Sequence, residues 1–560
     1  MRRVTRPVTV GKVTIGGGAL PVVQSMTSTP TTDIGATAEQ VLRLHGAGSR
    51  LVRIALPNRR ALKALPALRS RLSSHHEPVP LVGDIHFSLA MALEALPLVD
   101  KIRVNPGNLL EPPLSRAVGA FPAPDDLEPL RSLFRAARSA GRAVRVGVNH
   151  GSLSRRIVEG FGRGVDAMVQ SAVEYVHIAE KEGFLDLVIS LKSSDPWDVV
   201  RANLGIASCC DYPLHVGVTE AGFGLQGRTR SAVGIGLLLR HGIADTIRVS
   251  LAEPPERELP VAYALVNAAR LFLIPGAPRG GTPRGVTPVE GVQVVSLREH
   301  AWPFTRIRFD GEDGHVYDPV SGRRVRVVSH SDPDRLPGEP AILRVTAAPP
   351  SPGDLATILA AVLDSAQTRD IIELQLPLPG PTAGGADRLT EVLARIAQPI
   401  TWEVVTPLAS DLLRAMVDLA QLVEAGLIQR LELHHGIDEA DDRASALDIL
   451  QGLGTGQWCA HIIACPQCGR CRIDVAELAT EVRRRLGARA GLTVGVMGCI
   501  VNGPGEMRGA DIGCVGEGQG KVALYAGGRL VAHGVPVEEA TLRLEALADA
   551  LESERAAGHH

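Results

Sequence analysis

The chain has 560 residues, a formal net charge of -2 and a hydrophobic fraction of 45%. This length exceeds what one hydrophobic core serves and suggests about three domains. The hydrophobic fraction excludes a disordered chain, and the near-neutral charge with only 3% aromatic residues argues against a nucleic-acid partner. The basic start lacks an apolar signal segment, and no apolar run of about 18 residues follows. We therefore expect a cytoplasmic protein with no membrane partner.

The first 275 residues alternate apolar, β-rich runs with amphipathic runs of helix length. A short glycine-centred hairpin at residues 9–16 precedes them. Eight such strand and helix units predict an α/β fold, a parallel (β/α)8 TIM barrel. The predicted strands cover residues 22–26, 51–56, 81–86, 101–106, 144–149, 187–192, 214–220 and 246–251.

The predicted strands end in polar residues, at the end of the barrel where enzymes of this fold place their sites. Any one cation there could simply cap its strand or pair with a carboxylate. Several like charges around one rim repel one another unless an anion neutralises them, so the pattern favours a site for a multiply charged anion such as a diphosphate. The cations are Arg53, Arg103, Arg145, Lys192 and Arg248, and their polar neighbours include Asp84, His86, Asn149, Glu220 and Ser250.

A Pro- and Gly-rich stretch begins at residue 276 and predicts a linker. Strands predicted at 341–347, 371–378, 400–405 and 430–435, with helical runs between them, indicate an inserted α/β middle domain. The sequence of the tail, residues 456–560, predicts a small α/β domain. Its expected elements are a strand, a helix, a strand, a Gly-rich turn, a hairpin and a final helix. The three predicted domains cover residues 1–275, 276–455 and 456–560.

Six of the eight cysteines lie in the tail. Cys465, Cys468 and Cys471 are each separated by two residues, and Cys499 ends a predicted strand. Such thiolates can enclose a structural zinc ion or an iron–sulfur cluster. The proline after Cys465 and the NGPGE segment after Cys499 favour the cluster, because small residues and Pro leave sulfur open to backbone N–H groups. From the cysteine spacing alone, both the zinc ion and the iron–sulfur cluster remain interpretations of this module.

Several motifs occur in one order along the chain: QSMTSTPT, VGDIHF, KIRVNPGN, VGVNHGSL, HVGVTEAG and DTIRVSL in the barrel, then CPQCGR and MGCIVNGPGE in the tail. Together they resemble the 4-hydroxy-3-methylbut-2-en-1-yl diphosphate (HMBPP) synthase family of the methylerythritol phosphate route to isoprenoids. The similarity covers residues 4–275 and 460–530. By its position, the segment 276–455 is similar to the inserted middle domain of the family's long, three-domain form.

The resemblance implies a reductive ring opening. In that reaction 2-C-methyl-D-erythritol 2,4-cyclodiphosphate takes up two electrons and loses water to give the linear diphosphate HMBPP. The resemblance also implies a 4Fe-4S cluster and, as electron donor, ferredoxin or flavodoxin, and no Gly-x-Gly-x-x-Gly motif follows a barrel strand to suggest a bound nicotinamide or flavin. The implied cluster ligands are Cys465, Cys468, Cys499 and Glu506.

The resemblance further implies roles in the barrel mouth. Glu220 is the acid expected to protonate the departing C3 hydroxyl group. Asn149 and Ser250 are additional hydrogen-bond donors to the substrate, and Asp84, His86 and Arg248 belong to the same pocket. The expected diphosphate ligands are Arg53, Arg103, Arg145 and Lys192.

Three alternatives remain at this point. Cys471 stands where family members usually have another residue, so an all-cysteine ligand set with Cys471 in place of Glu506 is a second interpretation. A second function is a non-redox TIM-barrel enzyme that acts on a phosphorylated or pterin-like substrate and carries a structural zinc module. The sequence also leaves open whether the tail closes over its own barrel or over the barrel of a partner in a homodimer.

Overall fold

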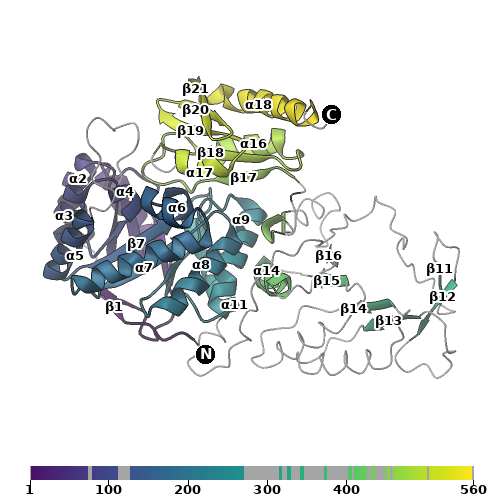
Figure 1. Ribbon diagram of the computed structural model, residues 1–560, viewed down its shortest axis with the longest axis horizontal. Helices are drawn as coiled ribbons and strands as arrows, with labels where there is room; N and C mark the ends of the chain where they lie inside the picture. Colours follow the sequence, from purple (N-terminus) through teal and green to yellow (C-terminus); the bar gives the residue numbers. More distant parts are fainter. Residues whose placement is uncertain are drawn as a thin grey trace. The chain divides into compact units, whose positions relative to one another are not determined.

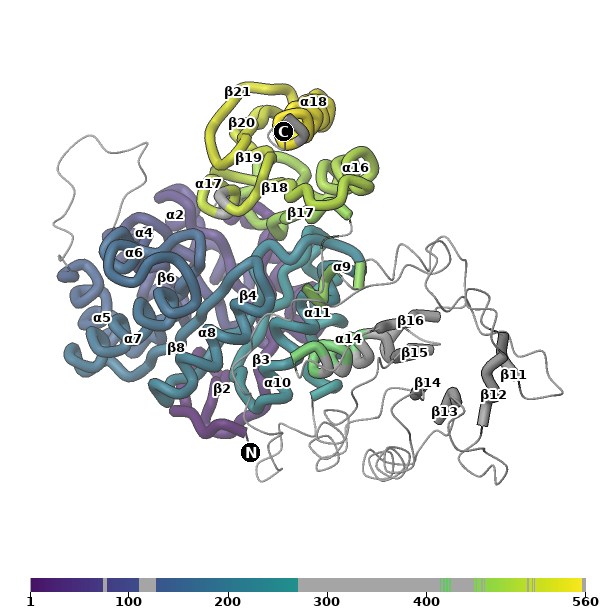
Figure 2. The backbone as a smooth tube through the Cα atoms, turned by 45° about the vertical axis from the view of Figure 1, so that its right-hand side comes forward, coloured from purple at the N-terminus to yellow at the C-terminus, as the bar shows by residue number. Residues whose placement is uncertain are grey.

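The computed structural model describes residues 2–73, 78–110, 127–269, 457, 459–500 and 503–557, with short segments between 315 and 454. By their contacts, residues 2–267 and 457–560 form one compact unit, and residues 268–456 with Met1 form another. The two ends of the chain therefore fold together (Figures 1 and 2). The domain boundaries predicted near 275 and 455 fall outside the described residues and stay predictions.

Within residues 2–269, the described strands form a ring of eight parallel strands in the order β8-β7-β6-β5-β4-β3-β10-β9. A parallel bridge between Ile189 and Leu214 joins the two ends of this order. The predicted TIM barrel is thus confirmed. Its strands are β3 (Val22–Met26), β4 (Leu51–Ala55), β5 (Leu81–Ile85), β6 (Lys101–Val104), β7 (Ala143–Asn149), β8 (Leu187–Lys192), β9 (His215–Val216) and β10 (Thr246–Ile247).

The predicted hairpin, β1 (Val8–Val10) and β2 (Val13–Ile15), plugs the N-terminal end of the barrel. Its four apolar side chains are buried against the first residues of the barrel strands, among them Val22, Leu51 and Val82. Apolar packing fills that end, so polar groups inside the barrel gather toward the C-terminal ends of the strands.

Helices surround the barrel, as Figure 1 shows. Their starts follow ordinary capping chemistry: the Asp33 carboxylate accepts from Ala36 N, and Asp195 accepts from Trp197 N and Asp198 N. The described helices are α1 (Ile34–Gly46), α2 (Arg59–Ser73), α3 (Leu89–Ala95), α4 (Pro106–Leu110), α5 (Glu128–Ala140), α6 (Arg155–Phe161), α7 (Val165–Lys181), α8 (Pro196–Cys209), α9 (Gly224–Ser231), α10 (Leu237–Arg240) and α11 (Pro255–Ala268), with short 3-10 helices η1 (Leu96–Leu98) and η3 (His150–Ser152) and a π-helical turn η4 (Ala232–Gly236).

The described tail residues form a five-stranded sheet in the order β17-β18-β19-β20-β21, parallel among the first three strands and antiparallel among the last three. Helices α16 and α18 pack on one face of the sheet and bury its largest apolar cluster. The elements are β17 (His461–Ala464), α16 (Val475–Leu486), β18 (Thr493–Met497), α17 (Gly503–Glu506), η6 (Met507–Gly509), β19 (Ile512–Gly518), β20 (Lys521–Ala526), β21 (Arg529–Pro536) and α18 (Val537–Ala557).

Strand β19 is an element that the sequence analysis missed, because its glycines suggested a turn. The structure explains these glycines by close packing. A Cβ on Gly513 would lie 2.2 Å from Met507 Cε and 2.3 Å from the Gly495 carbonyl oxygen, and a Cβ on Gly516 would lie 2.6 Å from the Gly498 carbonyl oxygen. Strands β18 and β19 therefore need glycine for space.

Replacing Gly513 by Ala should destabilise the protein by about 1–3 kcal/mol, the usual cost of overpacking. The added methyl group would have to displace Met507 and the backbone of Gly495. The midpoint of thermal or denaturant unfolding measures this loss. Gly509→Ala is the matched control in the same domain, since no atom lies within 4 Å of its added Cβ; equal stability of the two variants would contradict the packing argument.

The other unit is α/β as well. Strand β11 (His315–Tyr317) pairs antiparallel with β12 (Arg324–Val328), and β13 and β14 follow in parallel. Strands β15 and β16 form a parallel pair, and α14 (Ala409–Glu424) lies between them in sequence. Strands occur at all four predicted positions, as β13 (Ala341–Val345), β14 (Ile371–Leu374), β15 (Thr401–Val405) and β16 (Arg430–His434). No described helix of the chain is long and apolar enough to cross a bilayer.

Candidate functional site

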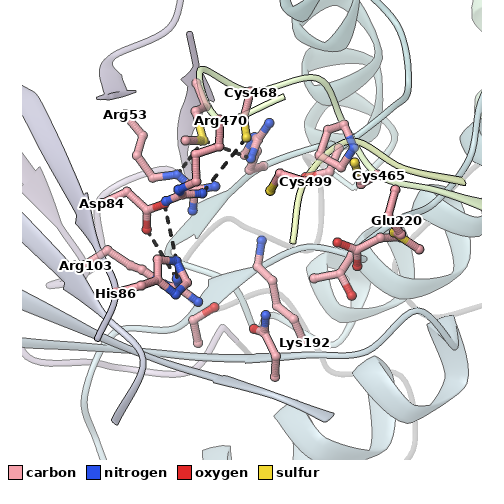
Figure 3. A pocket seen from close by; sticks show the side chains of 18 of the residues that line it. Arg53, Asp84, His86, Arg103, Lys192, Glu220, Cys465, Cys468, Arg470 and Cys499 are labelled. Carbon is pink, nitrogen blue, oxygen red and sulfur yellow. Dashed lines mark hydrogen bonds and ion pairs between the residues drawn. The ribbon is translucent and has the colours of Figure 1, made fainter. Parts of the chain in front are cut away.

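The C-terminal ends of the barrel strands and the cysteine loops of the tail line a shared cavity (Figure 3). It contains about 790 Å³ of space between atoms, part of it open to solvent. The predicted residues on its wall are Arg53, Asp84, His86, Arg103, Arg145, Asn149, Lys192, Glu220, Arg248, Ser250, Cys465, Cys468 and Cys499.

Glu506 is the remaining predicted residue. It ends the short helix α17, and its side chain lies outside the described part of the structure. The first residue of that helix, Gly503, lines the cavity itself. The backbone of the NGPGE segment thus reaches the cavity, while the predicted role of the Glu506 carboxylate stays a prediction.

The strand register explains why the polar side chains gather. Asp84 on β5 pairs with Arg103 on β6, and Arg103 pairs in turn with Arg145 on β7. Two pleat periods further along β7, Asn149 pairs with Lys192 on β8. Residues paired across parallel strands point to the same face, here the inside of the barrel. The strand register therefore places these cations close together.

Crowding and burial both disfavour the charged forms of these cations. Arg145 is 1% exposed, and its Nε and Nη1 atoms have no hydrogen-bond partner within the described residues. Burial, followed by repulsion from neighbouring cations, lowers the pKa of Arg145 and that of Lys192 well below their usual values. Burial also lowers the pKa of Arg103 to about 10, opposed by the charge of Glu220. An anion bound in the cavity would reduce the repulsion among these cations and favour their charged forms.

Asp84 is the carboxylate at the centre of an ion-pair network in Figure 3. Its oxygens lie 3.3 Å from Arg103 Nη1 and 3.6 Å from His86 Nε2, and it also accepts from Arg470 of the tail. Burial and the nearby arginines lower the pKa of His86 well below its usual value, so this imidazole is neutral. Its Nε2 accepts from Arg103 Nη1 at 2.7 Å, which fixes the direction of that guanidinium group.

Glu220 follows the short strand β9 and has an unusual backbone. Its φ of 48° lies in the left-handed region, which a residue with a side chain rarely adopts and which is often found at functional sites. The side chain is buried, and its Oε2 atom has no hydrogen-bond partner within the described residues. Burial raises the pKa of this carboxyl group, opposed by the neighbouring Thr219 side chain and the charge of Lys192.

Gly217 makes room for this arrangement. A Cβ there would lie 2.7 Å from Lys192 Nζ and 2.5 Å from the Arg248 carbonyl oxygen. Beyond Glu220, Ala221 forms a parallel bridge with Ala464 at the end of β17. The strand segment that carries Glu220 is thereby joined directly to the strand that leads into Cys465.

The cysteines come from two loops at one edge of the tail sheet. Cys465 follows β17, and Cys499 follows the neighbouring strand β18. Gly498 N donates to Cys465 Sγ at 3.1 Å, and backbone donors of this kind are typical around iron–sulfur clusters. Among the described residues, no three His, Cys, Asp or Glu side chains already stand in the geometry of a metal site. The donor set of three thiols on one cavity wall with a backbone N–H donor still fits an iron–sulfur cluster.

The Cys471 thiol lies within hydrogen-bonding reach of the thiols of Cys465 and Cys468. It packs with Ile473 against the apolar core of the tail, and in the described residues it is not part of the cavity wall. Its Sγ accepts from Cys468 N at 3.3 Å, and a Cβ on Gly498 would lie 2.4 Å from it. Cys471 is therefore close enough to these two thiols for the all-cysteine ligand set to stay a second interpretation.

Comparisons with known proteins agree with these motifs. Residues 5–263 match the family model described as the GcpE TIM-barrel domain, and residues 461–550 match the GcpE protein C-terminal domain. A 4-hydroxy-3-methylbut-2-en-1-yl diphosphate synthase (flavodoxin) of Bacteroides thetaiotaomicron is 33% identical, over 97% of each chain. One from Chlorobaculum tepidum is 31% identical over 97% of this chain and 88% of its own. A chloroplastic, ferredoxin-type relative from Oryza sativa is 31% identical over 96% and 86%.

The chain belongs to the HMBPP synthase family. The family assignment made from the motifs is thereby confirmed. The matches to these synthases run through the middle segment as well, since they cover 96% or more of this chain.

The structure of this HMBPP synthase family member adds cavity residues that the sequence analysis did not single out. Arg470 is the most informative, because it is a buried cation contributed by the tail. Its position inside the CPQCGR motif was the available signal. Met26 is another, and its thioether sulfur lies 2.9 Å from Arg53 Nε and 3.6 Å from Arg248 Nη1. The others are Ser190, Thr219, Pro466, Met497 and Gly503.

Proposed function

We propose that this chain converts 2-C-methyl-D-erythritol 2,4-cyclodiphosphate into HMBPP by reductive ring opening and loss of water. One observation carries the proposal: five cations at the ends of barrel strands, four of them buried, share a single cavity with three cysteines of the tail. A structural zinc module needs no contact with the substrate pocket. The shared cavity therefore favours the reductase over a non-redox barrel enzyme that acts on a phosphorylated or pterin-like substrate.

Cys465, Cys468, Cys499 and Glu506 are the residues that would hold a 4Fe-4S cluster. When bound, the cluster supplies single electrons at low potential to a substrate held in the cavity. A carboxylate is a harder and weaker ligand for iron than a thiolate, so Glu506 is the ligand most readily exchanged. The donor is flavodoxin or ferredoxin, the two carriers named for the relatives, and the cytoplasm stays our expectation for the place of reaction.

The barrel residues bind and orient the diphosphate. Arginine holds phosphate oxygens through two parallel N–H donors, and Arg145, a residue of the cavity wall, has two nitrogens without a hydrogen-bond partner among the described residues. The negative charge of the substrate relieves the repulsion among the cations. The proposed ligands are Arg53, Arg103, Arg145 and Lys192, with Asn149, Ser250, Arg248 and His86 around them.

Glu220 supplies the proton for the departing C3 hydroxyl group. Its raised pKa keeps a proton on the carboxyl group to higher pH than usual, and bound diphosphate neutralises the cations that oppose this. Loss of the hydroxyl group as water needs this proton at the moment when the C–O bond breaks.

Closure of the tail over its own barrel is the arrangement that we propose for catalysis. The bridge between Ala221 and Ala464 and the ion pair between Asp84 and Arg470 support it. In this arrangement, a homodimer is not needed to complete the site. We retain the domain limits 1–275, 276–455 and 456–560 as proposals.

The first experiment is anaerobic purification with iron and sulfide analysis and electron paramagnetic resonance of the reduced protein. We expect four irons and four sulfides per chain and a spectrum that changes when the cyclodiphosphate is added. Turnover with a chemical reductant would then yield HMBPP. Stoichiometric zinc without sulfide would overturn the reductase assignment, and a cluster spectrum indifferent to substrate would argue against an exchangeable Glu506.

The cysteine substitutions give a second test. Cys468→Ala should lose most of the cluster iron, because the proposed cage then lacks one of its thiolates. Cys471→Ala should keep close to four irons per chain, because Glu506 is the proposed fourth ligand and Cys471 does not line the described cavity. Iron analysis after anaerobic purification reads both results. Loss of the cluster in Cys471→Ala with retention in Glu506→Ala would support the all-cysteine ligand set instead.

A further inference from the structure

Arg470 makes an unusual contact between the two domains of the proposed site. It lies in the cysteine loop, residues 465–474, which joins β17 to α16 in the tail. Its side chain is only 8% exposed and is directed into the barrel mouth, where Nη2 donates to Asp84 Oδ2. Its other terminal nitrogen, Nη1, lies 4.0 Å from Cys468 Sγ. One guanidinium group thus spans the distance from a barrel carboxylate to a cluster cysteine (Figure 3).

The residue before Arg470 shows how closely the cysteine loop is pressed onto the barrel. A Cβ on Gly469 would lie 2.4 Å from the carbonyl oxygen of Thr29, in the segment that follows β3. Only glycine permits this approach without displacing backbone. The cysteine loop therefore rests on the barrel at two neighbouring points, by shape at Gly469 and by charge at Arg470.

The contact with Arg470 explains why the Asp84 carboxylate lies in the wall of an anion-binding cavity. A carboxylate in the wall of an anion-binding cavity competes with the anion for cations, which weakens binding unless the carboxylate has another task. Asp84 is 1% exposed and lies between Arg103, on its own barrel, and Arg470, on the tail. Receiving the cation of the cysteine loop is a task that no other residue of the described cavity wall performs.

We propose that Arg470 is a positioning residue that, seated on Asp84, holds the cysteine loop against the barrel mouth and places a positive charge beside the Cys468 sulfur. The proposal rests on the proposed function, since the value of this geometry lies in the cluster that Cys468 would bind. Two consequences follow. Loss of either partner frees the loop, and the two partners change the local charge in opposite directions.

Because the two substitutions change the charge near Cys468 in opposite directions, the midpoint potential of the cluster tests the proposal. A reduced cluster carries one more negative charge than an oxidised one, so a nearby cation stabilises the reduced state and raises the midpoint potential. Arg470→Gln should therefore shift the midpoint potential of the holoenzyme to more negative values. Asp84→Asn removes the charge that offsets Arg470 and should shift the midpoint potential to more positive values.

The tether itself is measured by hydrogen–deuterium exchange of the holoenzyme. In both single variants, amides in the cysteine loop should exchange faster, and kcat/KM should fall by about 100-fold, a loss typical of reacting groups held about 1 Å out of place. The double variant Asp84→Asn with Arg470→Gln should be no worse than either single variant, because both changes break the same contact. Arg470→Lys keeps the charge and should keep the midpoint potential near that of the wild type.

Arg472→Gln is the matched control, because Arg472 belongs to the same loop and has the same charge but is exposed. It should match the wild type in exchange, potential and turnover. Arg470→Gln behaving like Arg472→Gln would overturn the proposal, as would potentials that shift in the same direction in Arg470→Gln and Asp84→Asn. A wild-type protein without any iron–sulfur cluster would instead overturn the proposed function, while the exchange measurements would still test the contact between Asp84 and Arg470.

Discussion

Replacing Glu220 by Gln is expected to lower kcat by about 100- to 10,000-fold, the usual contribution of a positioned general acid. Gln has nearly the shape of a protonated Glu but cannot release a proton to the departing hydroxyl group. The affinity for the cyclodiphosphate should change little, because the cations that bind it remain. Steady-state turnover with a chemical reductant, together with calorimetric binding of the substrate, separates the two quantities.

The role of Glu220 as an acid also predicts the direction in which kcat changes with pH. Glu220 must carry its proton to act, and burial raises the pKa of its carboxyl group. The value of kcat should therefore be constant at low pH and fall as the pH rises through this raised pKa. In Glu220→Gln the alkaline fall assigned to this group should disappear from the residual activity.

Glu253→Gln is a suitable control for Glu220. Glu253 lies between β10 and α11, accepts from Gly224 N and pairs with Arg228 at 2.6 Å, both on the helix α9 that follows Glu220, but it does not line the described cavity. Its variant should retain both turnover and the alkaline fall. A fall in affinity and loss of the cluster in Glu220→Gln would show that Glu220 holds the structure together and does not donate the proton.

The barrel was predictable because its strands repeat one simple pattern. Each is a short, nearly continuous apolar run followed by polar residues, and burial on both faces of a parallel sheet requires that composition. The pairing of Asp84 with Arg103, and of Arg103 with Arg145, then follows from the register. The strand-end pattern thus indicated which side chains would surround the mouth, although their roles remain predictions.

Features that depend on contacts between distant segments were not accessible in this way. The glycines of β19 resemble a turn until Met507 is seen packed against Gly513. Nothing local indicates that Glu220 has a positive φ, since the strain is imposed by the packing around it. The pairing of Arg470 with Asp84 joins residues 386 positions apart, and only the folded chain brings them together.

Replacing Arg145 by Met should weaken substrate binding and stabilise the protein at the same time. Arg145 is 1% exposed among other cations, and three of them, Arg53, Arg103 and Arg248, contribute to lowering its pKa. A neutral side chain of similar length removes a buried charge that the substrate-free protein leaves without a full complement of partners. The thermal midpoint should rise by about 2 °C or more, equivalent to about 1 kcal/mol.

The loss of binding should be much larger than this gain. Removing one member of a buried, hydrogen-bonded charge pair costs about 2–5 kcal/mol, so KM should rise by about 30-fold or more. Arg131→Met on the exposed face of α5 is the control, and should change neither KM nor the midpoint of unfolding. A lower thermal midpoint in Arg145→Met would show that Arg145 is part of a stabilising network within the free protein. A higher midpoint with unchanged KM would show that the repulsion is real but that the diphosphate binds elsewhere. A rise in both KM and the thermal midpoint fits only one explanation. Arg145 is then unfavourable in the substrate-free protein and binds the anionic substrate.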